Sequence, residues 1–286
     1  MLIEARRLSY TYMPGTPFQV RALQNINLTV QKGEFVGIIG ETGSGKSTLV
    51  QHFNGLLKPT EGELLINGKN VWTEGTGLRQ LRSRIALLFQ FPEHQLFEET
   101  VFKDIAFGPR NLGLKNGEVE KSVRYSMELM GLNYSSYKDR SPFSLSGGEK
   151  RRAAMAGIMA MDPEVIILDE PAAGMDPLGR RQFMETISML HREENLTVIL
   201  VTHNMEEVSR LADRLFVLSQ GKMVLEGTPS VVFNSPATIK ESGLEMPPLT
   251  YLLTRMRECG KKVRTDIFNV EEAGEEILRL YGEVHR

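Results

Sequence analysis

Residues Gly40–Ser47 have the sequence GETGSGKS, in which the residue types and their spacing fit a loop that binds phosphate. The stretch matches G-x-x-x-x-G-K-[ST], a loop whose backbone N–H groups surround the α- and β-phosphates of a nucleotide. Its glycines allow positive φ angles and a close approach of the backbone to the phosphates. Lys46 supplies a cation for the β- and γ-phosphates, and the Ser47 hydroxyl can coordinate Mg²⁺. We therefore predict a nucleotide-binding site.

The residues on either side of this loop predict the strand and the helix that such a site requires. Residues 35–39 are mostly apolar, which is typical of a buried strand. After the loop, Leu49, Val50 and Phe53 recur at helical spacing. A helix that begins at the loop adds free N–H donors and the positive end of its dipole. The alternative, a glycine-rich turn that binds nothing, does not account for this context.

A second group of chemically active residues follows the apolar run Val165–Leu168, where two carboxylates, Asp169 and Glu170, stand side by side. A strand there would deliver Asp169 beside the phosphate loop, where the carboxylate can hold Mg²⁺. Glu170, one residue further on, could orient and polarise a water molecule that attacks the γ-phosphate. Taken alone, this pattern also fits an ordinary strand end, and the phosphate loop upstream favours the catalytic interpretation.

The stretch Leu145–Glu149, with the sequence LSGGE, precedes a predicted helix. A serine and two glycines at a helix N-terminus offer a hydroxyl, exposed amides and the positive end of a dipole to a phosphate. One nucleotide does not need two such sites on one chain. We therefore expect LSGGE to close over the nucleotide of a second subunit in a head-to-tail dimer. A plain helix cap would leave the paired glycines unexplained.

The composition and net charge of the chain narrow the classes of protein to which it can belong. The chain has 286 residues, of which 41% are hydrophobic and 24% charged, an ordinary globular balance for one large domain with a smaller appendage. The net charge of −2 argues against binding to nucleic acid. The single cysteine, Cys259, excludes an internal disulfide. The charged N-terminus lacks the apolar stretch of a signal sequence, and no apolar run is long enough to span a bilayer, so we expect a soluble protein.

The order of apolar patterns predicts an α/β fold with three additions. Alternation in residues 1–33 and a hairpin around Asn67-Gly68 predict an antiparallel β subdomain. Residues 91–162 have helical spacing and predict an inserted helical subdomain, after which strands and helices alternate up to residue 235. Residues 236–286 form a tail with two predicted amphipathic helices, the second capped by Asn269. We expect the tail to dock on this chain or on a partner.

With these motifs in this order, residues 1–235 resemble the ATP-binding cassette (ABC) ATPases, whose core is a RecA-like α/β domain. GETGSGKS is similar to the Walker A loop, VIILDE to the Walker B strand and LSGGE to the signature motif, with Glu149 where many members have Gln. Residues Ala173–Asp176, with the sequence AGMD, are similar to the D-loop, which in the family is more often SALD.

The resemblance implies ATP as the nucleotide, Mg²⁺ as its cofactor and ATP hydrolysis as the activity. It adds three residues to those already singled out: Gln90 at the Q-loop, His203 at the switch histidine and Tyr12 at the adenine-stacking position, although Tyr12 could instead pack in the core.

The residues that the resemblance places in each role are then as follows. Those expected to bind ATP are Tyr12, Gly40, Glu41, Thr42, Gly43, Ser44, Gly45, Lys46, Ser47 and Thr48. Those expected to act on the γ-phosphate are Glu170, His203 and Gln90. The expected Mg²⁺ ligands are Ser47, Gln90 and Asp169. The residues expected to contact a partner's ATP are Ser146, Gly147, Gly148 and Glu149, and Asp176 belongs to the D-loop.

The stretch Gln90–Gly113, QFPEHQLFEETVFKDIAFGPRNLG, resembles the ATPases of energy-coupling factor (ECF) transporters, and with DEPAAGMDP it is most similar to the second, A-prime type. This resemblance implies a prokaryotic protein at the cytoplasmic face of the membrane, in a heterodimer with a paralogous ATPase. It also implies a transmembrane T component, a substrate-binding S component, and import of vitamins or transition-metal ions. The tail resembles the group's short C-terminal dimerisation region.

Six apolar residues after Gln90 exceed what one helix face usually buries. They predict an apolar groove that accepts a helix of a membrane partner, although all six could instead pack inside the helical lobe. These residues are Phe91, Leu96, Phe97, Val101, Phe102 and Phe107.

Two other functions compete with an ECF transporter ATPase. The ATPase subunit of another ABC importer or exporter would share every motif, and the segment 90–113 argues against it. A non-transport ABC ATPase that acts on nucleic acid usually has two cassettes or a coiled-coil insertion, whereas this chain has one cassette and no basic excess.

Overall fold

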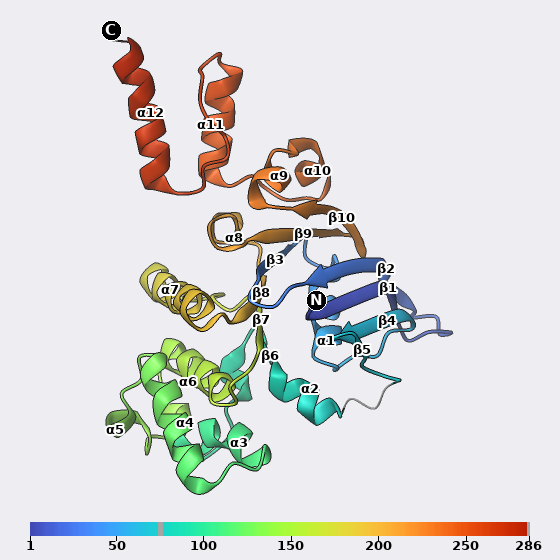
Figure 1. Cartoon of the computed structure of the whole chain (residues 1–286), viewed down its shortest axis with the longest axis vertical. Coiled ribbons are helices and arrows are strands. Elements are labelled where there is room, and N and C mark those ends of the chain that lie inside the picture. The colour runs from blue at the N-terminus through green and yellow to red at the C-terminus, as the bar shows by residue number, and fades with distance from the viewer. Residues whose placement is uncertain (74–76, 285–286) are drawn as a thin grey trace.

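The computed structural model describes residues 1–73 and 77–284 and is built around a six-stranded sheet (Figure 1). Five strands of this sheet run parallel, and the edge strand β10 pairs antiparallel with β9. The strands lie in the order β10 (Lys222–Gly227), β9 (Arg214–Ser219), β3 (Phe35–Ile39), β8 (Thr197–Val201), β7 (Val165–Asp169) and β6 (Ile85–Leu88).

Strand β3 is buried along its whole length because both faces of the sheet are covered. Phe35 and Ile39 pack on one face with the helices of the insert and of the C-terminal half. Val36 and Ile38 pack on the other face against the first helix and the second sheet. A near-continuous apolar run, rather than an alternating one, is what a parallel strand covered on both sides requires.

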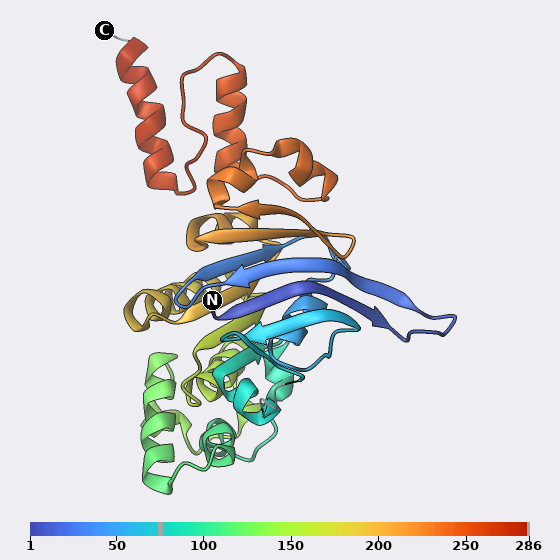
Figure 2. The same ribbon diagram turned by 45° about the vertical axis from the view of Figure 1, so that its right-hand side comes forward.

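A four-stranded antiparallel sheet lies across one face of the first (Figure 2). Helix α1 (Lys46–Phe53) packs between the two sheets, and its Leu49, Val50 and Phe53 are fully buried there. The predicted hairpin turn is present, with positive φ at Asn67 and Gly68. The strands lie in the order β2 (Val20–Val30), β1 (Ile3–Tyr12), β4 (Glu61–Ile66) and β5 (Lys69–Asn70).

The predicted helical insert lies between β6 and β7, at the lower left of Figure 1. Helices α3, α4 and α6 pack on one another and bury Ile105, Val123 and Met155 among them. Helix α2 (Leu78–Arg84) lies before β6 and therefore precedes the insert. The insert itself consists of the 3₁₀ turn η1 (Pro92–Gln95), α3 (Val101–Asn111), α4 (Asn116–Leu129), α5 (Tyr134–Tyr137), the 3₁₀ turn η2 (Pro142–Ser144) and α6 (Gly147–Met159).

After β7 the chain alternates helices and strands as predicted, through α7 (Pro177–Glu194) and α8 (Met205–Leu211). Two short helices then follow β10, namely α9 (Pro229–Phe233) and α10 (Pro236–Glu241). Each begins with a proline, Pro229 or Pro236, at the first helical position, where the missing N–H costs nothing.

The tail consists of α11 (Pro248–Glu258) and α12 (Val270–Val284), which project from the body at one end of the molecule (Figures 1 and 2). The two helices and the loop between them share a small core around Leu253, Val263 and Ile267. Asn269 caps α12 as predicted, because its Oδ1 accepts from the Glu272 N–H at 2.7 Å. The predicted tail therefore docks largely on itself.

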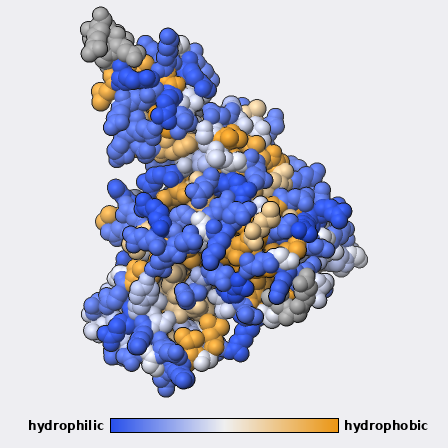
Figure 3. Space-filling model, viewed as in Figure 1, coloured by the Kyte–Doolittle hydropathy of each residue, from blue (hydrophilic) through white to orange (hydrophobic). Residues whose placement is uncertain are grey.

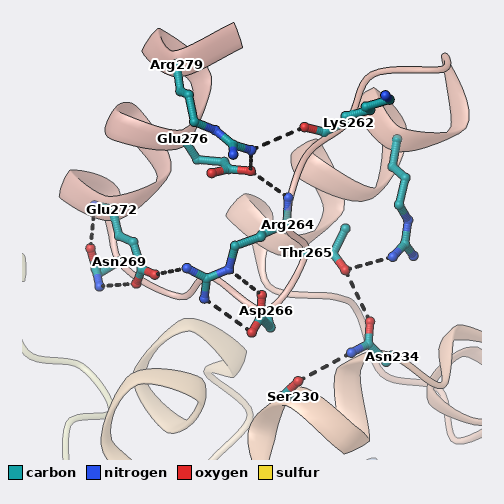
Figure 4. A network of polar contacts seen from close by, with 11 residues as sticks. Ser230, Asn234, Lys262, Arg264, Thr265, Asp266, Asn269, Glu272, Glu276 and Arg279 are labelled. Carbon is teal, nitrogen blue, oxygen red and sulfur yellow. Dashed lines mark hydrogen bonds and ion pairs between the residues drawn. The ribbon is translucent and has the colours of Figure 1, made fainter.

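Polar contacts join the tail to itself and to the body (Figure 4). Arg264 forms ion pairs with Asp266 and Glu272 across the connection to α12. The Thr265 hydroxyl lies 3.3 Å from Oδ1 of Asn234, the residue that ends α9. This contact fixes the inter-helix loop of the tail against the body.

The α/β fold with an antiparallel subdomain, a helical insert and a helical tail is thus confirmed. Within residues 1–73 and 77–284, no helix has the length and apolar character needed to cross a membrane.

Candidate nucleotide site

The loop at Gly40–Gly45 has the backbone of a phosphate cradle. Gly40, Gly43 and Gly45 all have positive φ, at 157°, 82° and 105°. A Cβ on Gly40 would lie 2.2 Å from the Leu218 carbonyl oxygen, so only glycine fits there. Gly45 caps α1 without a side-chain acceptor, which leaves the first N–H groups of the helix free for an anion. The loop therefore has both the shape and the donors that the sequence predicts.

Lys46 extends over this loop. Its Nζ donates to the carbonyl oxygens of Gly40 at 2.7 Å and Glu41 at 2.8 Å. Burial lowers the pKa of Lys46, and the nearby carboxylates of Glu170 and Asp169 act against that shift. The ammonium is thus held beside the loop, where the phosphates of a nucleotide would replace the carbonyl oxygens as its partners.

Asp169 and Ser47 face each other across the site. The Asp169 side chain is buried and accepts a hydrogen bond from Ser47, and burial raises the pKa of Asp169. A hydroxyl and a carboxylate are hard oxygen donors of the kind that Mg²⁺ prefers. These two residues therefore fit the magnesium ion that the sequence implies.

Glu170 and His203 form a close pair. The Glu170 Oε1 lies 2.7 Å from His203 Nδ1, although the His203 side chain is 72% exposed and that of Glu170 only 15%. Glu170 also has a φ of 50°, a left-handed conformation that costs a non-glycine residue energy. Its N–H donates to the Val201 carbonyl at 2.9 Å, which binds this turn to β8. Strain of this kind is concentrated at functional positions.

These groups converge because they follow adjacent parallel strands. Gln90 comes two residues after β6, Asp169 ends β7, and His203 comes two residues after β8. The carboxyl ends of parallel strands meet at one edge of the sheet, where ligands of open α/β sheets bind. All three residues line one cavity of about 710 Å³ together with the phosphate loop.

Tyr12 also lines this cavity. Its hydroxyl lies 3.1 Å from the Thr48 hydroxyl, and Tyr10 packs edge-on against its ring. At 38% exposure the ring is half open to the cavity, so it is not a core residue. The structure thus leaves a ring face available for stacking.

Part of the cavity wall carries no motif and was missed. It is formed by the start of β2 and the β9–β10 turn, which meet where Gln24 N–H donates to the Gly221 carbonyl. No local pattern indicates such a contact between distant segments. These wall residues are Val20, Arg21, Ala22, Gln24, Gln220 and Gly221.

The LSGGE motif caps a helix as predicted. The Ser146 side chain accepts from the Glu149 N–H, and Glu149 Oε2 accepts from the Ser146 N–H at 2.7 Å. The Tyr137 hydroxyl donates to the other oxygen of Glu149 at 2.7 Å. Mainly because of this bond to Tyr137, the pKa of Glu149 is lowered to about 2. Gly147 and Gly148 have open space where a side chain would begin.

The motif does not belong to the cavity of its own chain. Among the described residues that line the 710 Å³ cavity, none comes from Ser146–Glu149. Asp176 is likewise outside it and caps α7, where its Oδ1 accepts from the Gly179 N–H at 2.9 Å. The two phosphate-type motifs of this chain, GETGSGKS and LSGGE, therefore do not share one cavity.

A groove of about 570 Å³ lies on the helical insert, between α2, α3 and α6. Phe97 and Phe107 line it, are about half exposed and pack edge-to-face at 4.9 Å. Leu96 is buried, and Val101 packs in the core. Phe102 is partly buried against the core, and Phe91 is exposed outside the groove. The six predicted residues are thus distributed among the groove, the core and the surface.

Comparison with known proteins gives a single answer. Residues 23–173 match the ABC transporter family model. The chain is 50% identical over 280 residues to an energy-coupling factor transporter ATP-binding protein, EcfA2, of Clostridium acetobutylicum, with 98% of each chain covered.

Solved structures agree with this. The chain matches CbiO1 of Clostridium perfringens, described as part of an ABC transporter complex, with a TM-score of 0.74, 36% identity and coverage of 88% and 98%. It also matches a dimeric, post-hydrolysis ATP-binding cassette bound to ADP and Pi, with a TM-score of 0.72, 27% identity and coverage of 80% and 99%. The chain therefore belongs to the ABC transporter ATPases and, within them, to the EcfA2-type ATP-binding proteins of energy-coupling factor transporters.

Proposed function

We propose that this ABC ATPase works as one half of a pair of cassettes, in which each cassette's LSGGE segment completes the nucleotide site of the other. The observation that carries the proposal is the separation of the two anion sites within one chain. The phosphate loop, Asp169 and Glu170 line the cavity, whereas Ser146–Glu149 do not. The second cassette is a paralogue, as the resemblance to the A-prime type suggests, and the tail contributes to the pairing.

Within the site, each side chain has a distinct task. Lys46 and the N–H groups of the loop and of α1 bind the phosphates, and the Tyr12 ring stacks on the base. Ser47, Asp169 and Gln90 would hold Mg²⁺, which neutralises charge on the β- and γ-phosphates when it is bound. Glu170 orients the attacking water and accepts its proton, while His203 fixes the Glu170 carboxylate through the 2.7 Å contact and faces the γ-phosphate.

The groove on the helical insert suggests how hydrolysis reaches a membrane partner. Phe97 and Phe107 offer exposed apolar surface beside the segment that leads from Gln90, and an amphipathic helix of a T component would bury it. The complex then lies at the cytoplasmic face of the membrane. The cargo, a vitamin or a transition-metal ion, is bound by an S component and not by this chain.

The role of Glu170 gives the direct test of this mechanism. In the complex purified through a tag on this chain, Glu170→Gln should lower the ATP hydrolysis rate by about 100-fold or more, because a positioned general base contributes that much. ATP binding, measured by calorimetry, should be retained. Glu193→Gln removes one carboxylate from the exposed end of α7 and is the matched control. Undiminished hydrolysis by Glu170→Gln would overturn the assignment.

A further inference from the structure

An ion pair joins α7 to α8 next to the nucleotide site. The Arg180 Nε lies 3.1 Å from the Glu207 Oε1, and the two side chains are 34% and 10% exposed. The Nε makes no hydrogen bond, so the contact is electrostatic rather than an aligned hydrogen bond. The neighbouring pair Arg181–Glu185, on the same helix, is 71% and 55% exposed. Two adjacent arginines thus form one sheltered pair and one surface pair.

The sheltered position makes the pair costly to break. Burial raises the pKa of Glu207, while Arg180 and, after it, Arg210 favour the charged carboxylate. Glu170 and Glu206 are the like charges that face it. Removal of Arg180 would leave a buried carboxylate without its main counter-charge, which is far less favourable than the loss of an exposed pair.

Each partner lies within about the first turn of its helix. Asp176 caps α7, and its carbonyl accepts from the Arg180 N–H at 2.9 Å. Asn204 caps α8, and its Oδ1 accepts from the Glu207 N–H at 3.1 Å. His203 directly precedes Asn204 in the chain. The ion pair therefore links the beginnings of the two helices that carry the D-loop and the switch histidine.

Arg180, but not Glu207, also lines a cavity that includes residues of the phosphate loop. Arg180, His203 and Asn204 line a second cavity, of about 730 Å³, which includes Gly40 and Thr42. A shift of α8 relative to α7 would therefore move His203 while leaving the nucleotide-binding groups of α1 in place.

We infer that Arg180 and Glu207 are positioning residues for hydrolysis, because their ion pair fixes the starts of α7 and α8 and thereby holds His203 Nδ1 against Glu170. This inference rests on the proposed roles of Glu170 and His203. Neither Arg180 nor Glu207 lines the cavity that holds the catalytic carboxylates, so neither is a catalytic residue.

The test measures kcat, the ATP KM and the ATP Kd of the complex purified through a tag on this chain. Arg180→Met and Glu207→Gln should each lower kcat about tenfold or more, since small displacements of catalytic groups have large effects on rate. KM and Kd should stay within about twofold, because neither residue lines the cavity that contains Lys46, Ser47 and Thr48. Arg181→Met, which removes the adjacent exposed pair, should leave all three unchanged.

Two further variants separate positioning from general damage. The first variant, Arg180→Lys, keeps the positive charge. The second combines Arg180→Glu with Glu207→Arg and so restores an ion pair. Each should recover at least a third of the lost kcat. Equal losses in kcat and in ATP binding, or failure of both to recover activity, would overturn the inference. If Arg180→Met does not fold, Glu207→Gln, which is close in shape, decides the outcome in the same way.

A last variant separates this inference from the function on which it rests. His203→Ala should lower kcat strongly with ATP bound normally. If it does so while Arg180→Met and Glu207→Gln do not, only the positioning role is wrong. If His203→Ala leaves kcat unchanged, the proposed role of His203 fails and the positioning role fails with it.

Discussion

Glu149 is a carboxylate within the motif that we propose to contact a partner's phosphate. Both of its oxygens are occupied within the chain, by the Ser146 N–H and by the Tyr137 hydroxyl. Its pKa of about 2 keeps it charged at neutral pH, where these donors hold it. With Glu149 where many family members have Gln, the helix cap is intact, and the space beside Gly147 and Gly148 is open.

His52 makes the stability of the phosphate-loop helix dependent on pH. The imidazole is fully buried in α1, with its Nδ1 2.7 Å from the Thr48 carbonyl and its Nε2 without a partner. Burial lowers its pKa to about 4, against about 6.5 in the unfolded chain. Between about pH 6.5 and pH 4 the unfolded state binds the proton and the folded state largely does not, so stability falls as the pH falls through this window.

We expect this histidine to lower the free energy of unfolding by about 2 kcal/mol between pH 8 and pH 5. Urea denaturation of the wild type and of His52→Leu at both pH values measures the effect. The variant loses contacts, so its absolute stability is lower, but its decrease between the two pH values should be smaller by that amount. Equal decreases in the two proteins would show that His52 does not titrate as described.

The sequence allowed prediction of those site residues that belong to local motifs. Phosphate binding demands glycines and a lysine at fixed spacing, so Gly40–Lys46 could be recognised without a structure. Asp169, Glu170, Gln90 and His203 follow apolar strands, and parallel topology brings such strand ends together. Arg180 and Glu207 could not be found, because the ion pair depends on the packing of two helices that are distant in sequence.

Helix α3 carries the groove that we assign to a membrane partner. Its Phe107 is 46% exposed, and Phe97 from the preceding segment is 56% exposed. In Figure 3 an apolar area lies at the lower end of the molecule, over the part that α3 occupies in Figure 1. Burial of these aromatic side chains by a partner would remove a large apolar area from water, which favours binding.

Phe107→Ser should weaken this contact without affecting the nucleotide site. We expect the amount of membrane subunit that co-purifies with this chain to fall about tenfold, since loss of a well-packed aromatic anchor commonly costs 1–2 kcal/mol or more. Tyr125→Ser, which removes an exposed aromatic from α4 outside the groove, is the control. Unchanged co-purification with Phe107→Ser, at unchanged ATP affinity, would place the contact elsewhere.

The short helices α9 and α10 are elements that the sequence alone did not predict. Thr228 caps α9 through its side chain, and Pro229 and Pro236 occupy first helical positions. Prolines can end a segment or begin a helix, and the residues around them do not decide between the two. Burial decides here, because Val232, Phe233 and Ile239 pack into the main core.

At the scale of the whole molecule, the chain is an α/β body with a projecting tail, and the LSGGE segment lies outside the cavity that the phosphate loop lines. The tail is held by its own small core and by the Thr265–Asn234 contact (Figure 4). The body carries one anion site in the cavity and another outside it. This arrangement is the basis of our proposal that a second cassette completes the site and that membrane subunits use the energy of hydrolysis.

The most direct test of this account is the subunit composition of the complex that this chain forms. The tagged chain would be expressed in its own host, extracted from membranes in mild detergent and identified with its partners by native mass spectrometry. The account predicts one copy of this chain, one paralogous ABC ATPase and at least one integral membrane subunit. A dimer of this chain alone, or a complex with RNA or DNA and no membrane subunit, would contradict it.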